Sequence, residues 1–153
     1  MLLFLLPVVS KAQSFTIYIT DNRGNQNLAY NYLITSDSLV ITGLADNGKS
    51  NVNYLHRKLT KDEAKSIAGF LKDFPLENIN ESYFGEYNNM TYITPDHFPR
   101  VIEVRVVEGK RRAYTKMNNA YVSMLVPFFN KVETILPDEV KFRLNAADFG
   151  KTF

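Results

Sequence analysis

The chain has 153 residues, of which 45% are hydrophobic and 22% are charged, and these proportions are ordinary for a folded domain. Such a composition excludes an intrinsically disordered chain and supports one hydrophobic core. A formal net charge of +2 gives the molecule no overall attraction to nucleic acid, so we expect no nucleic-acid partner. Because the sequence contains no cysteine, we expect no disulfide and no thiol nucleophile.

The first residues, MLLFLLPVVSKAQS, have the character of a secretory signal peptide. The apolar run Leu2–Val9 is shorter than the roughly 20 residues that a membrane-spanning helix needs, so we expect no integral membrane span. Small residues follow at the positions that a signal peptidase reads, although no Lys or Arg precedes the run. We expect a signal peptide over residues 1–12, cleavage after Ala12, and one exported domain, periplasmic or secreted, over residues 13–153. A buried N-terminal strand is the alternative.

Alternation of apolar and polar residues predicts strands in the first part of the domain. Phe15, Ile17 and Ile19 alternate with polar residues, and a second alternating run, Leu28–Ile34, follows the sequence DNRGNQ. We expect these runs to form an antiparallel pair with Ile19 opposite Leu28, because that register places every apolar residue on one face.

The segment GLADNGKS matches the P-loop pattern G-x-x-x-x-G-K-[ST], with Gly43, Gly48, Lys49 and Ser50 in the fixed positions. A P-loop needs a helix that begins at the Lys-Ser pair and holds phosphates at its N-terminus. The next residues, NVNYLHRKL, are poor helix formers, whereas Asn-Gly strongly favours a two-residue hairpin turn. We interpret the match as chance and expect a third strand over Ser38–Leu44, a fourth strand after the turn, and no nucleotide or other cofactor.

The turns also predict an apolar row on the outer face of the sheet. The second turn places Leu33 opposite Val40, and the Asn-Gly turn places Val40 opposite Leu55. An apolar row across an otherwise polar sheet face usually has a cover. We expect the C-terminal segment 145–153 to cover it, and a partner protein is the alternative.

Two helices have recognisable boundaries. TKDE is a capping box in which Thr60 and Glu63 satisfy each other's backbone N–H groups. The apolar stripe that follows it ends at Pro75 and consists of Ala64, Ile67, Ala68, Leu71 and Phe74. A second apolar stripe runs over 122–136, where Pro127 is expected to kink the helix or to begin a new one.

The sequence VIEVRVVEGKRRAYTKM predicts a hairpin that turns at Gly109 and Lys110, with Val106 opposite Ala113. Together the elements predict an α+β fold: an antiparallel sheet, made of a four-strand meander and a later hairpin, with two helices packed on one face.

Basic residues gather at this hairpin, at Lys110, Arg111 and Arg112. The predicted register pairs Glu103 with Lys116 and Arg105 with Tyr114 on the face away from the core. We therefore interpret the basic residues as a solvated hairpin, and an anionic partner is the alternative.

The long connection over 76–99 is rich in aromatic residues and has little periodicity. Connections of this length in a compact domain are usually functional or disordered, and aromatic density argues against disorder. The rings either pack against the edge of the sheet or form a recognition surface. The candidate binding residues in it are Tyr83, Phe84, Tyr87, Tyr92, His97 and Phe98.

Few residues are available for catalysis or metal binding. His56, predicted on the core face opposite Leu39, and His97, in a loop, show no metal-ligand spacing, so we expect no metal site. We interpret the chain as a non-enzymatic exported binding module whose partner is a protein or glycan of the cell envelope. The alternative is a small carboxylate-dependent hydrolase acting on a glycan or envelope substrate, with acids drawn from Glu81, Glu86 and Asp96.

Overall fold

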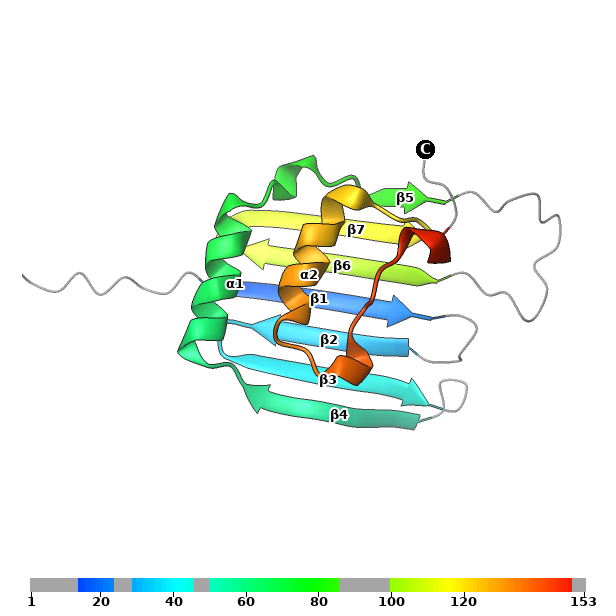
Figure 1. Cartoon of the computed structure of the whole chain (residues 1–153). Helices are drawn as coiled ribbons and strands as arrows, with labels where there is room; N and C mark the ends of the chain where they lie inside the picture. The colour runs from blue at the N-terminus through cyan, green and yellow to red at the C-terminus, as the bar shows by residue number, and fades with distance from the viewer. Residues whose placement is uncertain (1–13, 24–28, 46–49, 86–99, 150–153) are drawn as a thin grey trace, which may run out of the picture.

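The computed structural model describes residues 14–23, 29–45, 50–85 and 100–149. Within these residues, seven strands form one sheet in the order β4-β3-β2-β1-β6-β7-β5, and two α-helices lie on one of its faces (Figure 1). The fold is therefore α+β. The strands are β1 (Phe15–Asn22), β2 (Ala29–Thr35), β3 (Ser38–Ala45), β4 (Ser50–Lys58), β5 (Ser82–Phe84), β6 (Val101–Glu108) and β7 (Arg111–Asn118). The α-helices are α1 (Lys61–Asp73) and α2 (Val126–Glu133), and short 3-10 turns cover Leu76–Asn78, Ser123–Leu125, Asp138–Val140 and Ala146–Asp148.

The sheet is mixed, so the expectation of a purely antiparallel sheet is wrong. The meander β1–β4 and the hairpin β6–β7 are antiparallel as predicted, and β1 joins them by pairing with both β2 and β6. The unpredicted strand β5 pairs in parallel with β7. Backbone N–H groups of Lys116 and Gly85 donate to the carbonyls of Glu81 and Asn118, both over 3.0 Å, and hold this part of the long connection along the edge of β7.

The pairing of β1 with β2 differs from the predicted register. Ile19 faces Tyr32, four residues beyond the predicted partner Leu28. The strands extend to Asn22 and resume at Ala29, so their connection is longer than the predicted turn. A shift by an even number of residues leaves every side chain on its original face, which is why the predicted apolar face is still the buried one.

The pairing of β3 with β4 contains a β-bulge at Tyr54. Next to the connecting turn the predicted register is confirmed, with Gly43 opposite Val52. The register shifts between Ile41 and Thr42, and beyond this point Ile41 faces Leu55 instead of Tyr54. The bulge adds one unpaired residue to β4, and one residue is enough to reverse which face each later side chain occupies.

The bulge changes the predicted apolar row on the outer face. Leu33 faces Val40 as expected, but Val40 faces His56 and not Leu55. Leu55 is half-buried and packs against the core, whereas His56 is exposed. The predictions of Leu55 on the outer face and of His56 on the core face opposite Leu39 are both wrong, and the bulge is the physical reason.

The described part of the C-terminal segment lies on the helix side of the sheet (Figure 1). The buried ring of Phe142 lies 4.8 Å from the ring of Tyr32 and 5.0 Å from that of Phe129. Phe149 continues on this side, 6.2 Å from Tyr121. The prediction that segment 145–153 covers the outer face is therefore wrong for residues 145–149. The buried Phe142, just before the segment, places the chain on the helix side of the sheet.

The first helix, α1, begins and ends as the sequence indicates, whereas α2 covers only Val126–Glu133 of the stripe predicted over 122–136. The capping box of α1 is confirmed, with the Thr60 hydroxyl accepting from the backbone of Glu63 and the Glu63 carboxylate accepting from the backbone of Thr60. Pro127 stands in the first turn of α2, so it begins a new helix after a 3-10 turn. Proline is favoured there because the first N–H groups of a helix have no partner within it.

A buried carboxylate helps to fix residues 141–142, which lead into the C-terminal segment, to the sheet. Asp21 is fully buried and accepts hydrogen bonds from the guanidinium groups of Arg23 (3.0 Å) and Arg100 (2.7 and 2.8 Å). Each guanidinium also donates to a backbone carbonyl just before segment 145–153, Arg23 to Lys141 over 2.7 Å and Arg100 to Phe142 over 2.8 Å. We call Asp21, Arg23 and Arg100 the Asp21 clasp.

A second charged cluster joins the end of β4 to α1 and to the residues that follow α2. Arg57 donates to both carboxylate oxygens of Glu63 over 2.9 and 2.8 Å, and to the carbonyl of Ile135 over 3.0 Å. The Arg57 guanidinium and the Thr60 backbone N–H lower the pKa of Glu63 to about 2. Glu63 therefore keeps its charge in the folded protein at pH values that protonate an ordinary glutamate.

This lowered pKa predicts a pH-dependent contribution to stability. The folded pKa of Glu63 lies below the unfolded value of 4.5, so its contribution is complete above pH 4.5 and is lost as the pH falls towards 2. Glu63→Gln is expected to be less stable than the wild type at pH 7, with a difference that shrinks as the pH falls. Urea unfolding at several pH values measures it, with Glu139→Gln, at an exposed acid, as the control. A difference that does not change with pH would contradict the prediction.

Candidate functional site

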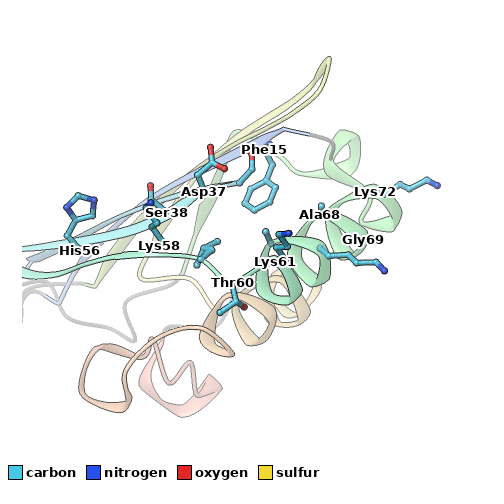
Figure 2. A pocket seen from close by; sticks show the side chains of 14 residues that line it. Phe15, Asp37, Ser38, His56, Lys58, Thr60, Lys61, Ala68, Gly69 and Lys72 are labelled. Carbon is cyan, nitrogen blue, oxygen red and sulfur yellow. Dashed lines mark hydrogen bonds between the residues drawn. The ribbon is translucent and has the colours of Figure 1, made fainter. Parts of the chain in front are cut away.

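A groove of about 1120 Å³ lies where α1 passes the end of the sheet (Figure 2). The start of β1, the turn between β2 and β3, the end of β4 and one face of α1 line it. Figure 2 shows Phe15 of β1 pointing towards α1, with Lys61 and Ala68 of the helix opposite it. We call this space the α1 groove. Its lining residues are Phe15, Ser36, Asp37, Ser38, His56, Lys58, Leu59, Thr60, Lys61, Ala64, Lys65, Ala68, Gly69 and Lys72.

Small residues of α1 leave the groove open. The helix buries Ile67 and Leu71 in the core, and on its neighbouring side it presents Ala64, Ala68 and Gly69. These three residues cannot fill the space between the helix and the sheet end. A Cβ atom at Gly69 would have no neighbour within 4 Å among the described residues. Part of the apolar stripe predicted for this helix, Ala64 and Ala68, therefore lines the groove, and Ala68 packs against the core as well.

Hydrogen bonds hold the opposite wall in place. The Thr35 hydroxyl accepts from the backbone N–H groups of Asp37 (3.2 Å) and Ser38 (3.0 Å) and so closes the turn. The carbonyl of Asp37 accepts from the backbone of Leu59 over 2.9 Å, which ties the turn to the chain entering α1. The backbone N–H of Phe15 donates to the Ser36 hydroxyl over 3.3 Å. The wall is thus fixed before any ligand arrives.

The rim of the groove is basic. Lys61, Lys65 and Lys72 follow one another at i, i+4 and i+11 on one face of α1, and Lys58 comes from the end of β4. All four side chains are exposed. Among the described residues, none of the four is in a salt bridge, and Asp37 is the only acid that lines the groove. The groove therefore combines an apolar floor with unpaired positive charge.

The groove shows no arrangement for metal binding. His56 lies at one end of the groove and Lys72 at the other (Figure 2). Within the described ranges, no three residues among His, Asp and Glu come close enough together to hold a metal ion.

The structure does not bring the aromatic candidates together in one described site. Tyr83 is half-buried, its hydroxyl accepts from the backbone of Asn80 over 3.0 Å, and its ring packs against the core. Phe84 is 66% exposed on the edge strand β5. Leu33 and Val40 stand on the outer face, and Leu55 on the helix side. The remaining candidates lie outside the described residues: Tyr87, Tyr92, His97 and Phe98.

The residues of the P-loop pattern occupy a hairpin where the structure describes them. Gly43 is buried within β3, and a Cβ atom there would lie 2.5 Å from the ring of Tyr54, so packing alone explains this glycine. Ser50 begins strand β4, whereas a phosphate cradle needs a helix N-terminus at this position. Gly48 and Lys49 lie outside the described residues.

The basic hairpin has a structural role. Arg111 donates to the carbonyls of Leu71 (2.9 Å), Lys72 (3.1 Å) and Phe74 at the end of α1, where the last carbonyls of a helix have few partners within it. The other basic residues of the turn, Lys110 and Arg112, are exposed.

Two cross-strand pairs of the hairpin confirm its predicted register. Glu103 faces Lys116 in a 3.1 Å ion pair, and the Arg105 guanidinium lies 5.4 Å from the centre of the Tyr114 ring. The acids considered for hydrolysis are not in the α1 groove where they are described. Glu81 is exposed and does not line it, and Glu86 and Asp96 lie outside the described residues.

Sequence reasoning missed the α1 groove, although the sequence carries a signal for it. The lysines of α1 recur at helical spacing on the side that also carries Gly69. A glycine inside a helix costs about 1 kcal/mol relative to alanine and needs a reason. Neither pattern identifies the opposite wall, because Phe15 and the turn at Asp37 reach the groove only through the tertiary fold.

Gly69→Ala is expected to stabilise the protein by about 0.5–1 kcal/mol. The position lies inside α1, is exposed, and offers free space for a methyl group. The free energy of unfolding in urea measures the change. Gly43→Ala is the contrasting variant and is expected to be destabilising, because its methyl group would meet the Tyr54 ring. A Gly69→Ala protein no more stable than the wild type would show that the open space is not what the structure describes.

Comparisons with protein families, with curated proteins and with solved structures found no match to this chain. In the part of the chain that the structure describes, neither helix is long and apolar enough to cross a membrane.

Proposed function

We propose that this protein is a non-enzymatic exported binding module and that the α1 groove is its binding site. One observation carries the proposal: the groove is lined both by apolar residues, including Phe15 and Leu59, and by lysines that have no salt bridge among the described residues. Binding sites are typically concave and mostly apolar, with a few charged groups that orient the ligand. The partner we propose is a protein or glycan of the cell envelope.

Binding fits the groove better than hydrolysis does. Hydrolysis by carboxylates requires two acids, roughly 5 to 10 Å apart, on either side of the bond that is cleaved. Among the described residues that line the groove, Asp37 is the only carboxylate. The hydrolase stays a prediction from sequence, with no observation in the groove that favours it.

A groove-filling variant tests the binding function. Gly69→Trp places a large ring at the groove, and Glu139→Trp places the same ring at an exposed site that does not line it. Each protein is used to capture partners from envelope extract of the native host. A captured partner is then purified and titrated calorimetrically. Loss of its affinity with Gly69→Trp alone supports the proposal, and equal affinity for both variants contradicts it.

Export has its own test. If residues 1–12 are a signal peptide, protein isolated from the native host begins at Gln13, because cleavage follows Ala12. Mass spectrometry of the intact protein measures the loss of twelve residues. An intact N-terminus on protein recovered from the cytoplasm would contradict export. The binding function would then depend only on the Gly69→Trp test of the α1 groove.

A further inference from the structure

The α1 groove also indicates what kind of partner it accepts. Resting on the proposed function, we propose that the groove docks an acidic amphipathic helix of another protein. The apolar face of that helix lies over Phe15 and Leu59, and its carboxylates face the lysines of the rim. Docking of an amphipathic helix in an apolar groove is a common form of peptide recognition, in which apolar side chains at i, i+3, i+4 and i+7 are the anchors.

The shape of the groove favours a convex partner. Phe15 is only 3% exposed and lies between the end of the sheet and α1, whereas the lysines that border the groove are exposed (Figure 2). A flat membrane surface would meet the ammonium groups before it met this apolar floor. A helix, with a diameter of about 10 Å including its side chains, is convex and can place one row of side chains on the floor.

The spread of charge favours a partner with several acids. Lys61 and Lys72 are eleven residues apart on α1, which at 1.5 Å per residue is roughly 16 Å. The single headgroup of a fatty acid or lipid would pair with the lysines at one end only. An acidic helix distributes carboxylates over several turns, so it can pair with Lys61, Lys65 and Lys72 together.

Two residues of α1 lower the stability of the helix, and no contact in the described fold accounts for their presence. Lys61 stands in the first turn, where the helix dipole disfavours a cation. Gly69 weakens the middle of the helix although no residue that the structure describes would meet a Cβ atom there. Both residues line the groove. A docked acidic helix accounts for both, because its carboxylates pair with Lys61 and its backbone approaches closely at Gly69.

Designed peptides test the inference directly. The probe is a fluorescein-labelled amphipathic helix with leucines on one face and glutamates beside them. Its controls are the same helix with lysine in place of glutamate, a peptide that scrambles the leucine and glutamate positions, and polyglutamate. Fluorescence anisotropy with the full chain is expected to show saturable one-to-one binding of the probe that weakens with added salt. The scrambled peptide is expected to bind at least tenfold more weakly, and the lysine helix not at all.

Charge reversal tests the role of the lysines by a gain of binding as well as by a loss of binding. Lys61→Glu with Lys65→Glu is expected to weaken binding of the glutamate helix at least tenfold and to create binding of the lysine helix. Such a gain requires a folded groove, so misfolding cannot produce it. Lys110→Glu with Arg112→Glu changes the net charge equally outside the groove and is expected to leave the affinity unchanged.

Three results would overturn the inference. These are equal binding of polyglutamate and the probe, lysine-dependent binding of phosphatidylglycerol vesicles that competes with the probe, or no binding of the probe by the full chain. If the probe fails while Gly69→Trp still releases a captured partner, the groove binds another class of ligand and the proposed function stands. If Gly69→Trp changes nothing and the probe fails, both proposals are wrong.

Discussion

Asp21→Asn is expected to lower the free energy of unfolding by about 3–5 kcal/mol, because it removes the one carboxylate of a buried charge cluster. The Asp21 side chain is fully buried, and those of Arg23 and Arg100 are only 20% and 16% exposed. Without the carboxylate, two guanidinium groups stay partly buried with no negative partner in the clasp. Unfolding in urea, monitored by circular dichroism, measures the loss.

The control for this variant is Asp37→Asn, which removes an exposed carboxylate by the same change. Its effect is expected to stay within about 0.5 kcal/mol. A loss below about 1 kcal/mol for Asp21→Asn would show that the clasp adds little to stability, as happens for ion pairs that remain solvated.

Phe142→Ala is expected to cost about 3–5 kcal/mol, the usual range for truncating a buried phenylalanine. The residue is 1% exposed, and its ring lies between Tyr32 of the sheet and Phe129 of α2. The substitution therefore leaves a cavity between two elements that cannot both move inward. Thermal and urea unfolding measure the loss.

Phe84→Ala removes the same ring from a position that is 66% exposed and is expected to change stability by less than about 0.5 kcal/mol. If the two variants were equally stable, Phe142 would not be part of the core, and the C-terminal segment would not lie on the helix side of the sheet.

Local signals predicted much of the fold. The capping box at Thr60 and Glu63 and the turn at Gly109 depend on neighbouring residues only, and the structure confirms both. The face that each strand buries was also predictable, since it follows from alternation. Alternation has a period of two and tolerates even shifts of register, which is why the error at Ile19 did not change its face.

The features that sequence reasoning missed depend on distant parts of the chain. The bulge at Tyr54 has no turn signal in the sequence. It places Leu55 on the helix side and His56 on the outer face, the reverse of the prediction. The parallel strand β5 is three residues long, too short for a periodic pattern, and β7 stabilises it from more than thirty residues away. The α1 groove lies between Phe15 and α1. Only the wall formed by α1 had a signal in the sequence, the spacing of its lysines.

The central position of β1 has a consequence for how the chain folds during synthesis. One edge of β1 pairs with β2, which follows it closely, but the other edge pairs with β6, where Asn22 meets Val101 and Phe15 meets Glu108. Non-local pairing of this kind slows folding, because a long loop must close before its contacts form. Until β6 has been synthesised, a nascent chain exposes an open strand edge to which other chains can pair. Ribosome-bound chains that end before residue 101 are therefore expected to aggregate or to recruit chaperones, and chains that extend beyond β7 are expected to do so much less.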